Sequence, residues 1–85
     1  MMTNAAKKTQ DTKPLDTIPA GAMVRIAVID AGSGLKNRLA AMGLLANELI
    51  RVVRNDRTGQ IIIQVKESKV ILGRGMSHKV FVTQA

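Results

Sequence analysis

The sequence predicts a mainly β fold, a small and partly open barrel of five short strands with one short α-helix between strands one and two. Apolar residues alternate with polar ones in several short stretches, which is typical of half-buried strands. Residues that favour tight turns separate these stretches. With 85 residues, the chain is too short for a two-sheet sandwich of useful thickness. Closing the strands into a barrel would remove exposed edges.

The N-terminal residues 1–14 are predicted to form a disordered tail, and residues 15–85 a single domain. The tail is polar and has no apolar periodicity. It ends in Pro14, which biases Lys13 toward an extended conformation. Leu15 and Ile18 are expected to anchor the start of the domain.

The first strand is predicted over residues 23–30. Alternation places Val24, Ile26 and Val28 on the inward face. The opposite face would hold Met23, Arg25, Ala27 and Ile29. Because this second face also carries apolar groups, we expect another element or a partner to cover part of it.

A short amphipathic helix is predicted after residues 31–34. Ser33 is a candidate N-cap because its hydroxyl can accept a hydrogen bond from a free backbone N–H. The buried face of the helix would hold Leu35, Leu39 and Met42. Gly43 can adopt the positive φ that ends a helix, and Leu44 would then pack back over the last turn.

Three further strands and a last short strand complete the predicted barrel. A corner at Ala46 and Asn47 leads into a strand over about residues 48–54, because Asn tolerates positive φ. A hairpin loop at residues 55–59 precedes the strand 60–66, and a tight turn at Glu67 and Ser68 precedes the strand 69–73. An irregular or single-turn connection then leads to the strand 80–82. The inward residues of these strands would include Ile50, Val52, Ile61, Ile63, Val65, Val70 and Leu72.

The strong positive charge suggests an acidic partner. The chain has 13 basic and 6 acidic residues and a formal net charge of +7. Nucleic acid, an anionic membrane surface or an acidic protein face would each fit this charge, and a charge spread over the surface for solubility is the alternative. The chain has no cysteine, which fits a cytoplasmic protein. We expect neither a signal peptide nor a membrane-spanning segment.

No catalytic, cofactor or metal site is predicted. The glycines at 32 and 34 precede the helix but lack the spacing of phosphate-binding loops. His78 is the single histidine, and it is expected to be a surface or packing residue. The acidic residues are scattered over loops and strand ends and show no paired spacing. We therefore predict that the protein is not an enzyme and holds no cofactor.

Non-specific nucleic-acid binding is one alternative function. Residues 15–85 contain ten basic residues and five acidic ones, and small barrels often bind oligonucleotides. Single-strand binders usually stack bases on aromatic side chains, however, and the one aromatic residue is Phe81. Sequence-specific recognition of nucleic acid is not expected.

A protein-interaction module is another possible function. The predicted outer faces carry Ile29, Leu45, Leu49, Val53, Ile62, Ile71 and Phe81. Contiguous exposed apolar surface usually marks an interface. The alternative is that the helix and loops cover much of this surface.

The segment RLAAMGLLANELIRVVRN, residues 38–55, resembles the signature of the ferrous iron transport protein A (FeoA) family. In that signature an Arg-Leu-x-x-Met-Gly-Leu helix end leads through a turn into a strand. The resemblance extends over about residues 15–82. The chain departs from the family pattern at Ala46 and Asn47, where Pro-Gly is common, and at Ala41, where an acidic residue is frequent.

This resemblance implies an SH3-like barrel that is cytoplasmic and acts as an accessory to FeoB, the membrane protein with a GTPase domain that imports ferrous iron. It extends to the SH3-like C-terminal domains of iron-dependent repressors, so a regulatory module is the second alternative. The sequence is also compatible with a homo-oligomer.

The resemblance and the residues together suggest a protein-interaction site at the helix end and corner. The docking residues would be Arg38, Met42, Gly43, Leu44 and Leu45. The basic residues Lys36, Arg51 and Arg54 would steer association with an acidic partner face.

Overall fold

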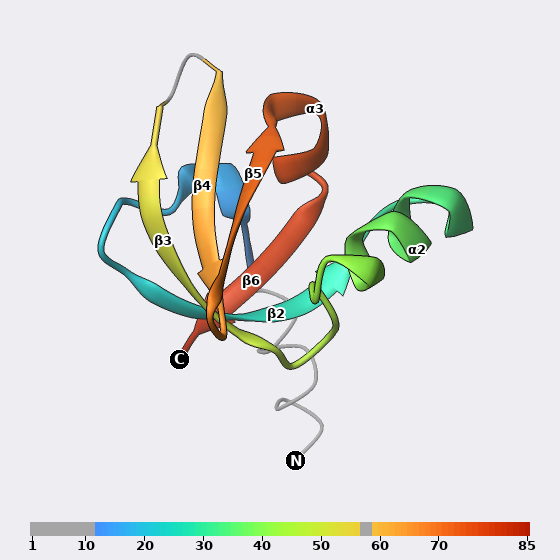
Figure 1. Cartoon of the computed structure of the whole chain (residues 1–85), viewed down its shortest axis with the longest axis horizontal. Coiled ribbons are helices and arrows are strands. Elements are labelled where there is room, and N and C mark those ends of the chain that lie inside the picture. The colour runs from blue at the N-terminus through green and yellow to red at the C-terminus, as the bar shows by residue number, and fades with distance from the viewer. Residues whose placement is uncertain (1–11, 57–58) are drawn as a thin grey trace.

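The computed structural model describes residues 12–56 and 59–85. They form one antiparallel sheet of six strands in the order β1-β6-β2-β3-β4-β5, which curls around a single core (Figure 1). The elements in chain order are β1 (Lys13–Pro14), the 3-10 helix η1 (Leu15–Thr17), β2 (Met23–Ile29), α2 (Ser33–Ala41), β3 (Leu49–Asn55), β4 (Gln60–Val65), β5 (Ser68–Gly73), α3 (Arg74–Ser77) and β6 (Val80–Gln84). The mainly β fold with a helix between the first two long strands is as predicted.

The sixth strand is β1, which the sequence analysis had placed in the tail. Lys13 pairs with Val82, and Pro14 pairs with Phe81. Two residues are too short to show alternation, so the sequence gives no signal for this strand. Leu15, in the η1 turn that follows, is buried in the core. The predicted disorder of the tail falls mostly on residues 1–11, which lie outside the described residues.

The core consists of aliphatic side chains, most of which occupy alternate positions along the long strands. Its members are Leu15, Ile18, Val24, Ile26, Ile29, Leu39, Leu44, Ile50, Val52, Ile61, Ile63, Val65, Val70, Leu72, Val80 and Val82. The predicted inward faces of β3, β4 and β5 are therefore confirmed. Each fully buried aliphatic side chain of this kind contributes about 1.5–3 kcal/mol to folding.

The end of β2 differs from the prediction. Val28 was expected to face the core and Ile29 to face outward, but Val28 is 49% exposed and Ile29 is buried. The register between β2 and β6 shifts between Ile26 and Val28, which marks an irregularity of the β-bulge type. An extra residue in one strand reverses the alternation beyond it. The expected apolar outer residue Ile29 is therefore a core residue.

The helix α2 projects from the sheet (Figure 1) and is more exposed than predicted. Leu39 is its one buried residue, and Leu35 is partly buried. The prediction that Met42 belongs to the buried face was wrong, because 36% of this residue is exposed. Ser33 is the first helical residue, and Gly32 occupies the N-cap without a side-chain hydrogen bond, so the predicted cap is also wrong.

The turn between β4 and β5 lies one residue earlier than predicted. Val65 pairs with Ser68, so the turn residues are Lys66 and Glu67. Lys66 has a φ of 55°, a conformation that the sequence did not suggest for lysine. The single-turn connection expected before the last strand is confirmed as α3.

Replacing Gly43 with alanine should destabilise the protein by about 1–2 kcal/mol. Gly43 has a φ of 92°, and an added Cβ would lie 3.4 Å from Cγ1 of Val65. The matched control is Gly34→Ala in α2, where a Cβ would meet no atom within 4 Å. Alanine there should stabilise the helix by about 0.5–1 kcal/mol. Urea unfolding measures both changes, and equal stability of the two variants would contradict the assigned helix end.

Replacing Leu44 with alanine should reduce the free energy of unfolding by about 2–5 kcal/mol. Leu44 is fully buried, whereas its neighbour Leu45 is 51% exposed. Leu45→Ala should therefore change the free energy of unfolding by no more than about 0.5 kcal/mol. Urea unfolding of both variants tests this assignment, which fails if Leu45→Ala proves the more damaging change.

Candidate protein-interaction site

The helix end of α2 is fixed by backbone hydrogen bonds. The N–H groups of Gly43 and Leu44 donate to the carbonyl oxygens of Ala40 and Leu39, each at 2.9 Å. The positive φ of Gly43 lets the chain reverse direction here, as predicted. This reversal carries the Leu44 side chain into the core, where it is fully buried. Leu44 thus fixes the helix end from inside and offers no surface to a partner.

The corner that follows is held on β2. The N–H of Asn47 donates to the carbonyl oxygen of Ile26 at 2.7 Å, and the N–H of Ile26 donates to the carbonyl oxygen of Glu48 at 3.0 Å. The guanidinium Nη1 of Arg25 donates to the carbonyl oxygen of Asn47 at 2.9 Å. Asn47 has a φ of 71°, in agreement with the predicted role of asparagine in this turn.

Four of the predicted site residues lie close in sequence on this exposed part of the chain: the docking residues Arg38, Met42 and Leu45 and the steering residue Lys36. Lys36 and Arg38 are exposed on α2. Met42 is 36% exposed and Leu45 is 51% exposed on either side of Gly43 and Leu44. We call Lys36, Arg38, Met42 and Leu45 the helix-end patch. It combines two exposed apolar side chains with two cations.

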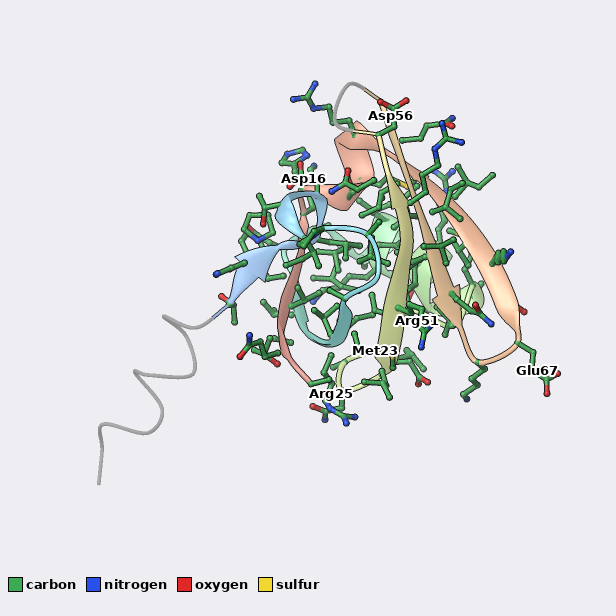
Figure 2. All side chains as sticks on the ribbon, turned by 90° about the vertical axis from the view of Figure 1, so that its left-hand side faces the viewer. Asp16, Met23, Arg25, Arg51, Asp56 and Glu67 are labelled. Atoms are coloured by element: carbon green, nitrogen blue, oxygen red, sulfur yellow. The ribbon has the colours of Figure 1, made fainter. Side chains whose placement is uncertain are left out.

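The remaining two site residues, Arg51 and Arg54, lie elsewhere. They are exposed on β3, which runs up the left-hand side of Figure 1, whereas α2 extends to the right. Figure 2, which looks onto that left-hand side, shows Arg51 beside Met23. The Nε of Arg51 donates to the Met23 sulfur at 3.4 Å. The structure therefore does not bring these arginines together with the helix-end patch.

A groove that the sequence does not reveal runs along β2. Its lining includes Met23, Ala27, Val28, Asn47 and Thr83. Val28 was assigned to the core, and the bulge beside it brings it to the surface. A bulge leaves no pattern in a single sequence that would distinguish it from regular alternation.

A second, polar pocket lies between η1, the β3–β4 hairpin and α3. Asp16, Asp56, Arg74 and the buried Ser77 contribute to its lining. Asn55 also lines it, and its Nδ2 donates to the carbonyl oxygens of Asp16 at 3.0 Å and Ile18 at 2.8 Å. These hydrogen bonds tie the first segment of the domain to β3. The pocket therefore follows from the way η1, β3 and α3 pack together, and we do not treat it as a binding site.

Within residues 12–56 and 59–85, no group of three or more His, Cys, Asp or Glu side chains is placed to hold a metal ion. His78 is exposed, and its Nδ1 lies 2.9 Å from the carbonyl oxygen of Arg74 in the same turn. Among the helices of the described residues, none is both long and apolar enough to cross a membrane.

The comparisons with known proteins agree on one family. Residues 13–84 match the FeoA domain model. A protein of Methanocaldococcus jannaschii named Fe(2+) transport protein A is 38% identical over 72 residues, which cover 85% of this chain and 87% of that protein.

Solved structures show the same fold. The crystal structure of an iron uptake regulatory protein (FeoA) matches with a TM-score of 0.80 and 28% identity, over 85% of this chain and 96% of that chain. A manganese-dependent transcriptional repressor also matches with a TM-score of 0.80, at 21% identity and over 87% of this chain but 42% of its own. The second likeness concerns the fold alone. The SH3-like barrel expected from the sequence is confirmed, and the chain belongs to the FeoA domain family.

Proposed function

We propose that this protein is a cytoplasmic accessory of ferrous iron uptake that acts by docking on the membrane transporter FeoB. Its family is that of Fe(2+) transport accessory proteins. One protein with a similar structure is described as an iron uptake regulatory protein. The proposal that FeoB is the partner rests on the resemblance of residues 38–55 to the FeoA signature. The proposal that the helix-end patch is the contact rests on its geometry.

One observation supports the helix-end patch more than any other. Met42 and Leu45 are exposed, although the backbone that carries them is fixed by hydrogen bonds to Leu39 and Ile26. Apolar side chains on a fixed backbone lose little conformational entropy when they bind, so they can act as anchors. Arg38 lies about one helical turn before Met42, and Lys36 adds a second exposed cation on α2, so both would favour an acidic partner surface.

The other sequence-predicted site residues have different roles in this proposal. Gly43 allows the chain to reverse direction after α2, and the buried Leu44 side chain anchors this reversal to the core. Arg51 and Arg54 on β3 contribute to the long-range positive potential that speeds association, but they do not belong to the contact. They therefore serve as controls.

The proposal is tested by capture of FeoB from detergent-solubilised membranes with the tagged protein. Leu45→Glu should weaken capture at least about tenfold, because burying a carboxylate at an apolar contact costs more than 1.4 kcal/mol. Arg38→Glu should weaken it as well, by reversing a charge at the edge of the contact. All variants should unfold at the urea concentration of the unmodified protein, within error, since these side chains are exposed.

The matched controls lie on β3. Val53→Glu adds the same charge at another exposed apolar position, and Arg51→Glu makes the same charge reversal as Arg38→Glu. Both controls should retain capture of FeoB. If the β3 variants lose FeoB while the helix-end variants keep it, the contact has been placed on the wrong face.

The same experiment separates the two alternative functions. Recovery of RNA or DNA in place of FeoB, lost steeply as salt is raised, would identify a non-specific nucleic-acid binder. Recovery of a DNA-binding regulator would identify a regulatory module of the repressor type. Either result would overturn the proposal.

A further inference from the structure

The strand β5 lies at one end of the sheet order and forms one margin of the sheet in Figure 2. Val65 and Ser68 flank a two-residue turn, so they form a hydrogen-bonded pair. Alternation along the ladder then directs the N–H and C=O groups of Lys69 and Ile71 away from β4. Within the described residues, neither backbone has a recorded hydrogen bond beyond the sheet ladder. A short stretch of open strand edge is therefore available to another chain.

The side chain at the centre of this edge is apolar. Ile71 is 58% exposed, the largest exposed fraction among the large apolar side chains described. Its neighbours Val70 and Leu72 are buried, so the strand is held firmly in the sheet. Proteins usually protect an open edge with charged residues, proline or a covering element. Lys69 provides such a charge at one of the two open positions, whereas Ile71 leaves an exposed apolar side chain at the other, on which a second chain can pack.

The charge around the edge selects the kind of strand that can pair with it. The three neighbouring strands β3, β4 and β5 contain no Asp or Glu. Lys69 is exposed on β5, and Arg74 is exposed at the start of α3, directly after this strand. Glu67 lies at the turn and points away from the strands (Figure 2). The open edge is thus bordered by positive charge.

A second copy of this chain fits the edge poorly. Antiparallel pairing of two β5 strands with Ile71 opposite Ile71 would place Lys69 opposite Gly73 of the other copy. This pairing would bring the cations Lys69 and Arg74 of both copies to one shared edge. Repulsion between these like charges works against it. An acidic strand would instead gain an attraction at each of them.

We propose that β5 binds an extended acidic segment of another protein by strand addition. The backbone groups of Lys69 and Ile71 supply the hydrogen bonds, an apolar residue of the partner packs on Ile71, and a carboxylate two positions away contacts Lys69. In this mode, main-chain hydrogen bonds provide affinity and alternate side chains provide specificity. The edge belongs to elements other than the helix-end patch, so this inference goes beyond the proposed function and does not depend on it.

The test uses the full chain and a fluorescein-labelled peptide in which glutamate and valine alternate on one face and threonine fills the other. Fluorescence anisotropy at physiological ionic strength measures the dissociation constant. We expect binding of this peptide and at least about tenfold weaker binding of a peptide with lysine in place of glutamate, since each tenfold step requires only about 1.4 kcal/mol. The acidic peptide with N-methyl groups on the amides that face β5 should also bind at least about tenfold more weakly, because it keeps the charge but loses the main-chain donors.

The variants locate the contact on the protein. Lys69→Glu should weaken binding of the acidic peptide about tenfold. Lys36→Glu makes the same change in net charge on α2 and should have less than about a twofold effect at this ionic strength. The amide resonances of Lys69 and Ile71 should show the largest chemical-shift changes during titration.

Three outcomes would overturn the inference. The acidic peptide and its N-methylated form could bind equally, which would mean that charge alone holds the peptide. The shift changes could centre on α2 and its corner, which would place the peptide on the helix-end patch. Sedimentation could show that the chain alone forms a dimer that Lys69→Glu strengthens, which would identify a second copy as the occupant.

Discussion

The hydrogen bonds between Ile26 and the corner after α2 determine how the rest of the domain is arranged. Ile26 donates to Glu48 and accepts from Asn47, so both of its backbone groups hold the corner in place. β3 begins beside β2 directly after this corner, and the strands that follow extend from β3. The same constraint sets the place where α2 leaves the sheet. A small domain with one aliphatic core has few other means of fixing a projecting helix.

At this corner, the residues that stabilise the fold are different from those that are exposed to a partner. Gly43 allows the chain to reverse direction, and the Leu44 side chain is buried in the core. Met42 and Leu45, on either side of them, remain exposed. A partner would therefore meet a surface whose backbone is already ordered, which lowers the entropic cost of binding. The β5 edge offers a second and chemically different surface, on which main-chain groups as well as side chains are available. An accessory protein with two such surfaces could contact two segments at once.

Regular strands and the helix end could be predicted from the sequence, because each depends on a local pattern. Ile61, Ile63 and Val65 alternate without interruption, and Gly43 follows the helix in the place where positive φ is needed. The bulge in β2 could not be predicted, since it depends on the pairing with β6, and it exchanged the roles of Val28 and Ile29. Met42 was assigned to the core because it shares the helix face of Leu39, and sequence spacing does not say how far a helix projects from its sheet. The distance in space between the two arginines of β3, Arg51 and Arg54, and the helix-end patch could not be predicted either, because it depends on the fold and not on how close the residues are in sequence.

Amide hydrogen exchange at the corner tests the central constraint most directly. The Asn47 N–H is bound to Ile26 at 2.7 Å, whereas the neighbouring Ala46 N–H has no recorded hydrogen bond within the described part of the chain. If the corner is fixed on β2, Asn47 should exchange only through global unfolding, and its protection should match that of core amides in β3. Ala46 should exchange quickly and so serves as an internal reference. Equal, rapid exchange at both positions would show that the corner opens freely, and the account of a pre-ordered docking surface would be wrong.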